Sequence, residues 1–458
     1  MEEVKTCARY YLKNPTTKDA TQKNDVSDVV FEYTPFIINE IDKLTRTSEK
    51  NLPRCNFCGA YANCYNKYDG SSMECCICNH KSQINALNRL NLEYMQPIYF
   101  AASSYNESDE NSFIATEYII SSLSLLSNQS FLSTISSITN QSSTFKHYGF
   151  AIFHGSISYL EFGKELNIKT VSNDMPKLQT DNLYCPSLVF SDNLKKATEF
   201  FSKIINNRST DASFILKVVK KLSHLRSSTI NIFLDENDFN SLSNDFDYHS
   251  LSDELIKYRI RINLLVFSQK ISKIHPIFEI PISTGGKFKI SQPSEINNIE
   301  TLIRSIVDQN VSYNSFIAIK TSGDLNCISG HGFTHGRGAH NCGIVSFGEH
   351  FYFDCSIPNI YNQYVQFNFL YTSVLSFSRL CVVTVHVVNL DYSREVLDRY
   401  LFNSLFLEIS HFEENSQRIL KEFEKRWNIS SSETKSWLSN ILILHFGIES
   451  QNSNEIEL

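Results

Sequence analysis

Residues 55–81 read CNFCGAYANCYNKYDGSSMECCICNHK and hold six of the twelve cysteines of the chain. Two Cys-x2-Cys pairs, Cys55–Cys58 and Cys75–Cys78, are separated by 16 residues. Each pair places two sulfurs on one turn, and the intervening length brings the second turn opposite the first. This spacing is typical of a four-thiolate zinc site, and it predicts a zinc ribbon.

The choice of ligands needs an argument because Cys64, Cys76 and His80 lie nearby. Cys76 sits inside the second turn, so we expect its side chain to point away from the metal. Four thiolates fill a tetrahedral zinc site and leave no open position for water, which makes the site structural rather than catalytic. We expect one structural zinc ion held by Cys55, Cys58, Cys75 and Cys78.

The whole chain has the composition of a globular protein, with 42% apolar and 20% charged residues. A length of 458 residues predicts two to four domains. The net charge of −7, with no markedly basic stretch, argues against bulk nucleic-acid binding. The first residues lack the apolar core of a secretory signal, and no apolar run is long enough to cross a bilayer. We therefore expect a cytoplasmic protein whose cysteines stay reduced and bind metal.

The patterning along the chain changes after the cysteine-rich block. Apolar runs at 148–153, 229–234 and 262–267 alternate with helical stretches, which predicts a mostly parallel sheet covered on both faces. From about residue 312 short β-branched and aromatic runs follow one another between turns, which indicates a β-sandwich. The fold class is therefore a multidomain α/β plus β protein. Its expected parts are a sandwich segment at 1–50, the zinc ribbon at 51–95, a von Willebrand A-like trunk at 96–310, the β-sandwich at 311–392 and a helical domain at 393–458.

Two local expectations concern the start of the trunk. The run PIYFAA at 97–102 is interpreted as its first strand, and 116–138 has helical spacing. Metal-binding domains of the von Willebrand A type place an Asp-x-Ser-x-Ser triad after the first strand. The first residue of such a triad, the Asp, is missing after 97–102. Because a hard cation needs carboxylate oxygens, we expect no magnesium site.

A second candidate for chemistry is the glycine-rich segment 330–343, GHGFTHGRGAHNCG. It contains His331, His335, His340 and Cys342, which suggests a metal or phosphate loop. Its spacing matches no known template, and a long loop between sandwich strands is the favoured interpretation. No nucleophile, kinase or deaminase motif is present, so we expect no catalytic residues.

The order of these parts resembles that of the inner-layer subunits of the COPII vesicle coat, the Sec-type zinc-ribbon and trunk proteins. Short stretches that resemble family segments run through most of the chain: RYYLKNP (9–15), PRCNFC (53–58), ECCIC (74–78), YGFAIF (148–153), IKTSGDL (319–325), VQFNFLYTS (365–373), RLCVVTVHVV (379–388) and WLSNILILHFG (437–447). The family has two siblings. IKTSGDL and WLSNILI favour the subunit that activates the coat GTPase, whereas the Cys-x2-Cys form of the first zinc turn favours the cargo adaptor. We prefer the first.

The resemblance implies a structural coat subunit in transport from the endoplasmic reticulum to the Golgi. Its expected partners are a homologous coat subunit, a small Sar-type GTPase, outer coat proteins and the endoplasmic reticulum membrane, with no nucleic acid. In the GTPase-activating sibling a C-terminal gelsolin-like domain supplies an arginine finger. This chain stops at Leu458, before such a domain, so we expect either a truncated chain or a degenerate relative with a scaffolding role, and no enzymatic activity.

An alternative is a von Willebrand A-type interaction module in a nuclear complex, with the zinc ribbon contacting nucleic acid. The few basic residues beside the cysteines (Arg54, Lys67 and Lys81) argue against it. A zinc hydrolase is a third hypothesis, but it requires a water ligand that four thiolates exclude.

Overall fold

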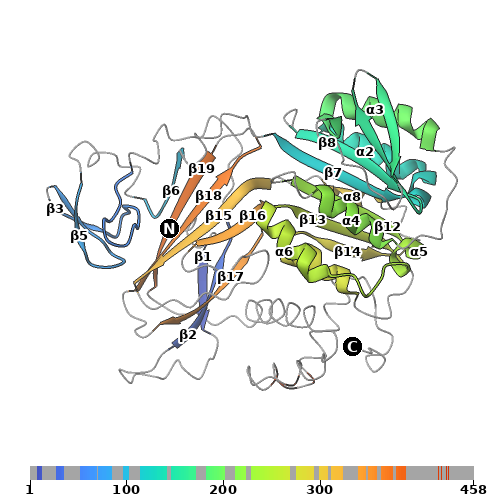
Figure 1. Ribbon diagram of the computed structural model, residues 1–458. Coiled ribbons are helices and arrows are strands. Elements are labelled where there is room, and N and C mark those ends of the chain that lie inside the picture. Colours follow the sequence, from blue (N-terminus) through green and yellow to red (C-terminus); the bar gives the residue numbers. More distant parts are fainter. Residues whose placement is uncertain are drawn as a thin grey trace. The chain divides into compact units, whose positions relative to one another are not determined.

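The computed structural model describes residues 8–12, 27–35, 52–69, 71–84, 96–102, 114–141, 146–163, 165–171, 182–201, 212–222, 228–268, 275–292, 299–307, 311–322, 339–346, 349–357, 363–374 and 378–387, with the isolated positions 421, 424, 430 and 432. The chain divides into two compact units (Figure 1). One unit takes 1–113 and 311–404, and the other takes 114–310 and 405–458. The expected helical domain at 393–458 lies outside the described residues, apart from the isolated positions.

The unit that contains 114–310 is built on an eight-stranded sheet. Strands β8, β7, β12, β13 and β14 are parallel neighbours, while β9, β10 and β11 pair antiparallel at one side. In spatial order the strands are β10 (Leu166–Val171), β9 (Ile157–Phe162), β8 (Lys146–Phe153), β7 (Ala115–Ser122), β12 (Ser228–Asp235), β13 (Arg261–Phe267) and β14 (Phe288–Ser291), with β11 (Cys185–Pro186) beside β8.

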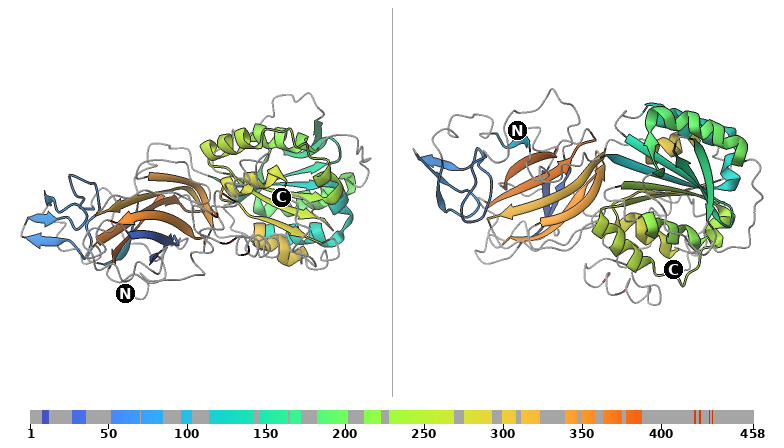
Figure 2. Two further views of the ribbon diagram at one scale, coloured as in Figure 1. Left: turned by 90° about the horizontal axis from the view of Figure 1, so that it is seen from below. Right: turned by 45° about the horizontal axis from the view of Figure 1, so that its top comes forward.

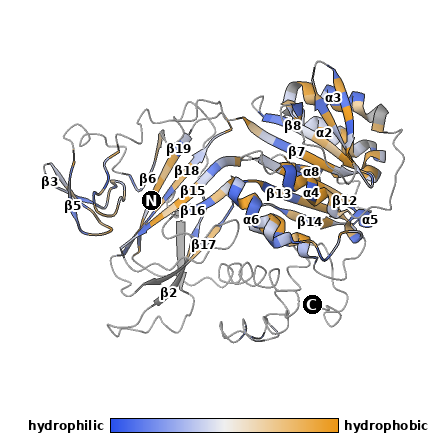
Figure 3. Cartoon of the chain, viewed as in Figure 1, coloured by the Kyte–Doolittle hydropathy of each residue, from blue (hydrophilic) through white to orange (hydrophobic). Residues whose placement is uncertain are grey.

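Helices cover both faces of this sheet (Figure 2). Phe233 and Leu265 face a core shared with α2, α3 and α8, whereas Ile232 and Leu264 lie with residues of α4 and α7 on the other side. Hydrophobic residues, orange in Figure 3, follow these strands and helices. The expected parallel sheet with helices on both faces is therefore confirmed. The helices are α2 (Gln129–Gln141), α3 (Ser187–Phe201), α4 (Ser213–Leu222), α5 (Glu236–Asn240), α6 (Tyr248–Tyr258), α7 (Glu279–Ser283) and α8 (Ile299–Val307), with 3-10 turns η5 (Leu123–Ser127) and η7 (Pro276–Phe278).

The first strand of this sheet is β7, which corrects the helical expectation for 116–138. Strand β7 is followed by η5, and the helix α2 begins only at Gln129. A central parallel strand is buried on both faces. Residues 117–122 of β7 are all buried, without the alternation expected of a surface strand. The mixed apolar and polar residues of β7, ATEYIISS, also satisfy helical spacing, and that ambiguity misplaced the boundary.

The other unit contains the β-sandwich. A five-stranded antiparallel sheet faces a three-stranded one, and aromatic rings fill the space between them. The ring of Phe367 stacks on Tyr33 at 4.5 Å and lies 5.7 Å from Phe353. The larger sheet has the order β16 (Ala339–Ser346), β15 (Val311–Thr321), β18 (Gln363–Thr372), β19 (Ser378–Val387) and β6 (Ile98–Ala102), and the smaller one β1 (Ala8–Leu12), β2 (Ser27–Tyr33) and β17 (Phe351–Ile357).

Strand β6 was expected to open the trunk, and that interpretation is wrong. It pairs antiparallel with β19 of the sandwich, with Cys381 opposite Phe100. Ile98 and Phe100 pack on the sandwich core, while Tyr99 and Ala101 belong to a second apolar cluster on the opposite face. Because both faces are covered, the run reads as continuously apolar, as a buried trunk strand would.

The zinc-ribbon region forms its own small antiparallel sheet of β3 (Lys67–Asp69), β4 (Ser72–Glu74) and β5 (Lys81–Gln83). It is fastened to the sandwich by a buried side-chain clamp. The backbone N–H of Tyr61 donates to Oε1 of Gln366 at 2.7 Å, and Nε2 of Gln366 donates back to the Tyr61 carbonyl at 2.9 Å. The Tyr99 hydroxyl donates to the Ala62 carbonyl at 2.7 Å. These bonds join strands β18 and β6 to the chain that follows the first cysteine pair.

The clamp predicts that Gln366→Leu loosens the ribbon while keeping side-chain volume. The buried Tyr61 N–H then loses its partner and the Tyr61 carbonyl keeps only its longer bond from Asn63, which lowers the free energy of local opening by about 2 kcal/mol. Amide hydrogen exchange in a peptide covering 52–69 should accelerate by about 30-fold. Gln83→Leu, at an exposed position of β5, is the matched control. Equal exchange in both variants would show that the clamp carries no stability.

Candidate metal centre

The two cysteine pairs sit on turns with the same backbone geometry. In the first turn the N–H of Gly59 donates to the Cys55 carbonyl at 2.9 Å, and the Cys55 N–H donates to the Ala60 carbonyl at 2.8 Å. In the second turn the N–H of Asn79 donates to the Cys75 carbonyl at 2.8 Å, and the Cys75 N–H donates to the His80 carbonyl at 3.0 Å. Gly59 and Asn79 have φ of 73° and 58°, in the left-handed region that glycine and asparagine tolerate best.

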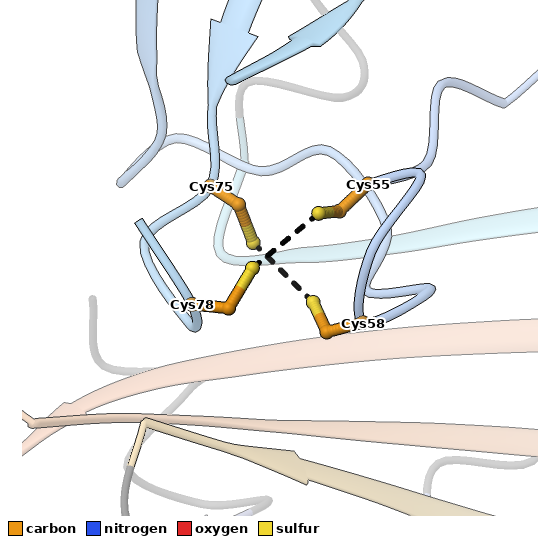
Figure 4. Close-up of side chains that lie close together, drawn as sticks. All are labelled: Cys55, Cys58, Cys75 and Cys78. Atoms are coloured by element: carbon orange, nitrogen blue, oxygen red, sulfur yellow. Dashed lines mark hydrogen bonds between the residues drawn. The ribbon is translucent and has the colours of Figure 1, made fainter. Parts of the chain in front are cut away.

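These turns point their four sulfurs at one another (Figure 4). All four lie within 4.8 Å of each other. The Cys55 and Cys78 sulfurs are 3.5 Å apart, and those of Cys58 and Cys75 are 3.6 Å apart. A disulfide needs about 2.05 Å, whereas a tetrahedron with Zn–S bonds of about 2.3 Å has sulfur separations of about 3.8 Å. The donor set and its geometry therefore fit a tetrahedral metal ion.

The surroundings of the sulfurs favour thiolates at some positions and oppose them at others. Burial raises the pKa of Cys55, but hydrogen bonds from the backbone of Cys58 and Phe57 and from Ser82 and Cys78 outweigh it and lower the pKa to about 6. Burial raises the pKa of Cys58 to about 11 and that of Cys75 well above its usual range. Four adjacent thiolates repel one another, so a divalent cation is the group that would stabilise them together.

The remaining candidates in the cysteine-rich stretch lie outside this cluster. The Cys76 sulfur is 3.6 Å from the side chain of Asn63, and burial raises its pKa to about 11. His80 stacks its ring on Phe57 at 5.5 Å. Cys64 is half-buried, and burial raises its pKa. Among the residues that the structure describes, the four-sulfur cluster is the one group of three or more metal-ligating side chains within reach of a common ion.

Sequence reasoning missed the residues that support the turns. Oδ1 of Asn66 accepts the Cys76 N–H at 2.9 Å, and buried Asn63 accepts the Tyr65 N–H at 2.9 Å and donates to the Tyr61 carbonyl at 3.2 Å. The two asparagines thus hold the second turn and the chain that leads to the sandwich. Their only signal in the sequence is an asparagine-rich link between the cysteine pairs.

The glycine-rich segment does not form a second metal centre among the described residues. His340 and Cys342 lie buried on β16, a sandwich strand, with the Cys342 side chain in the sandwich core. His331 and His335 lie outside the described residues. Residues 339–343 of the segment are therefore part of a sandwich strand and not of the expected loop, and 330–338 lie outside the described residues.

The magnesium position of von Willebrand A-type domains must be sought at β7, since β6 belongs to the sandwich. There Ser122, the last residue of β7, stands in place of the opening Asp, and Leu126 stands in place of the last serine. Asp235 at the end of β12 lies beside it. The Ser124 hydroxyl donates to one Asp235 carboxylate oxygen, and the Asp238 N–H donates to the other at 2.8 Å. Each carboxylate oxygen of Asp235 therefore already accepts a hydrogen bond from within the protein.

No protein-family model matches the sequence, and no curated protein matches it. By structure the chain is similar to the human COPII-coat protein Sec24c, with a TM-score of 0.70 and 12% identity over 95% of this chain and 67% of that one. It is also matched to the ArnB paralog VWA2 from Sulfolobus acidocaldarius, with a TM-score of 0.39 and 12% identity over 94% of this chain and 92% of that one. A third match is a von Willebrand factor type A protein from Catenulispora acidiphila, with a TM-score of 0.38 and 9% identity over 65% of this chain and 72% of that one. The likeness to Sec24c is one of fold. In the described part of the chain, no helix is both long and apolar enough to span a membrane.

The metal centre predicts opposite outcomes for neighbouring cysteines. Cys78→Ser should abolish bound metal and unfold the ribbon, because three thiolates and a hydroxyl make a much weaker site. Cys76→Ser and Cys64→Ser should keep one metal ion per chain. Elemental analysis of the purified proteins measures this directly, and equal loss from all three variants would contradict the ligand set.

The hydrogen-bonded Asp235 at the end of β12 predicts that millimolar Mg²⁺ leaves the midpoint of thermal unfolding unchanged. Ser122→Asp supplies the missing carboxylate beside Asp235, so that variant should be destabilised without cation and regain stability when Mg²⁺ is added. Ser121→Asp, at the neighbouring buried serine, is the control and should be destabilised without rescue. Differential scanning fluorimetry with and without Mg²⁺ distinguishes the two, and a Mg²⁺-dependent midpoint in the wild type would refute the closed site.

Proposed function

We propose that this protein is a structural subunit of a COPII-type vesicle coat, acting in transport from the endoplasmic reticulum to the Golgi. The observation that carries the proposal is the likeness to Sec24c, which extends over 95% of this chain rather than over one common domain. It spans the trunk, the sandwich and the ribbon described above. A shared trunk fold alone would support only a von Willebrand A-type module.

The ribbon supports a structural role within that proposal. Its four sulfurs are closed around one point, and soft thiolate ligands select zinc over the harder cations. We infer a single zinc ion at this site. Because the set leaves no position for water, the metal centre offers no hydrolytic chemistry. The buried bonds to Gln366 and Tyr99 instead make the ribbon part of the sandwich unit.

The proposed partners follow from the coat role. We propose that the protein pairs with a homologous coat subunit, engages a Sar-type GTPase and outer coat proteins, and lies on the cytoplasmic face of the endoplasmic reticulum membrane. It is assigned no enzymatic activity and no nucleic-acid partner. The preference for the GTPase-activating sibling stays a prediction.

The coat role predicts a stable complex. The tagged full chain, expressed in its own cells and purified gently, should bring down a partner of related zinc-ribbon and trunk architecture in about equal amount, as a coat heterodimer requires. The purified complex should then bind a Sar-type GTPase loaded with a non-hydrolysable GTP analogue and not the GDP form.

Two results would count against this proposal. Recovery of no related partner under conditions that preserve the zinc would remove its main consequence. Salt-dependent binding of DNA or RNA in a gel-shift experiment, without a partner, would instead favour the nucleic-acid-associated alternative. Binding of the GTPase with accelerated GTP hydrolysis would keep the coat role but overturn the absence of an activating function.

A further inference from the structure

The tip of the first cysteine turn carries an exposed aromatic ring. Phe57 is 75% exposed, compared with 44% for Ile114 and 47% for Val189, the other exposed large apolar side chains in the described part of the chain. Leaving a phenylalanine in water forfeits the free energy that its burial would release. Its position is therefore notable in a ribbon whose other aromatic rings, Tyr61, Tyr65 and Tyr68, are buried or half-buried.

The ring is held in place before any partner arrives. Phe57 lies between Cys55 and Cys58, and its backbone hydrogen-bonds to the Cys55 sulfur. The adjacent Asn56 N–H donates to the Ser82 hydroxyl at 2.9 Å, and the Phe57 ring stacks on His80 at an interplanar angle of 26°. A side chain fixed by a metal-closed turn loses little conformational entropy when it binds.

Apart from the metal-binding cysteines, the charged side chains beside this tip have one sign. In the described turns 54–60 and 75–81 they are Arg54 and Lys81, both exposed. The nearest carboxylate in sequence, Glu74, is half-buried and accepts a hydrogen bond from Lys67 at 3.0 Å. An exposed ring beside cations is complementary to an anionic, partly apolar surface.

We propose that the tip formed by Phe57, His80 and Lys81 inserts into the interfacial layer of an anionic lipid bilayer. The shape of the tip favours a membrane over a folded protein. A single protruding ring flanked by exposed asparagines at 56 and 79 has too little area for a protein interface unless the partner supplies a matching pocket. A fluid bilayer needs no such pocket. The inference rests on the proposed function for its setting, a protein that works at a membrane.

The test uses the purified full chain and vesicles of phosphatidylcholine alone or with about 30% phosphatidylserine. The wild type should float with the anionic vesicles, and less so as salt is raised, because headgroup attraction is screened. Phe57→Ala should weaken this binding about tenfold or more, and Lys81→Gln about fivefold. Phe57→Trp should bind at least as well as the wild type, because tryptophan favours the membrane interface.

Val189→Ala is the matched control, since it removes an exposed apolar side chain from α3 and should leave vesicle binding unchanged. Zinc content, measured on every variant, shows that the ribbon remains folded. Vesicle binding that is absent, or that is equal in the wild type and Phe57→Ala, overturns the proposal. If Phe57→Ala keeps vesicle binding but loses the partner subunit on co-purification, the tip is a protein interface. Recovery of a related partner without any vesicle binding leaves the coat role standing and removes only this inference.

Discussion

Cys55, Cys58, Cys75 and Cys78 bring four sulfurs together in a ribbon that has almost no other core. Apart from cysteines, the buried members of its apolar cluster are two alanines, one methionine and two isoleucines. So small an apolar core cannot offset the entropy of ordering the chain, and domains of this size need a staple. The sulfurs are the staple, and the backbone bonds of Gly59 and Asn79 aim them. The presentation of Tyr61 and Ala62 to the sandwich depends on that closure.

The ribbon and the sandwich in turn depend on each other through β6. One face of this strand packs on the sandwich core, and the other face, with Tyr99 and Ala101, lies in the cluster that also contains Leu52 and Tyr61. The clamp between Gln366 and Tyr61 joins positions 305 residues apart in the chain. A strand covered on both sides and a long-range buried hydrogen bond make the ribbon an integral part of the unit rather than a mobile appendage.

The sequence predicted most of this fold where one physical signal dominates. The two Cys-x2-Cys pairs identified the sulfur cluster, and β-branched runs such as 229–234 identified buried strands. Prediction failed where the same pattern of residue types fits two different structures. The run 97–102 is apolar because β6 is covered by the ribbon, and the residues of β7 satisfy both strand and helix patterns. The partners of Gln366, Asn63 and Asn66 were invisible because a polar residue in a strand or loop does not reveal which distant backbone group it meets.

Two places in this protein resemble metal sites, and they contrast with each other. The ribbon presents four converging sulfurs with no internal partner strong enough to stabilise four negative charges. The strand-end position at Ser124 and Asp235 is the reverse, because a hydroxyl and a backbone N–H already satisfy the carboxylate. A cation there would have to displace both bonds. A metal ion is therefore suited to the ribbon, where it closes a structure, whereas at the strand end it would compete with bonds that the protein already makes.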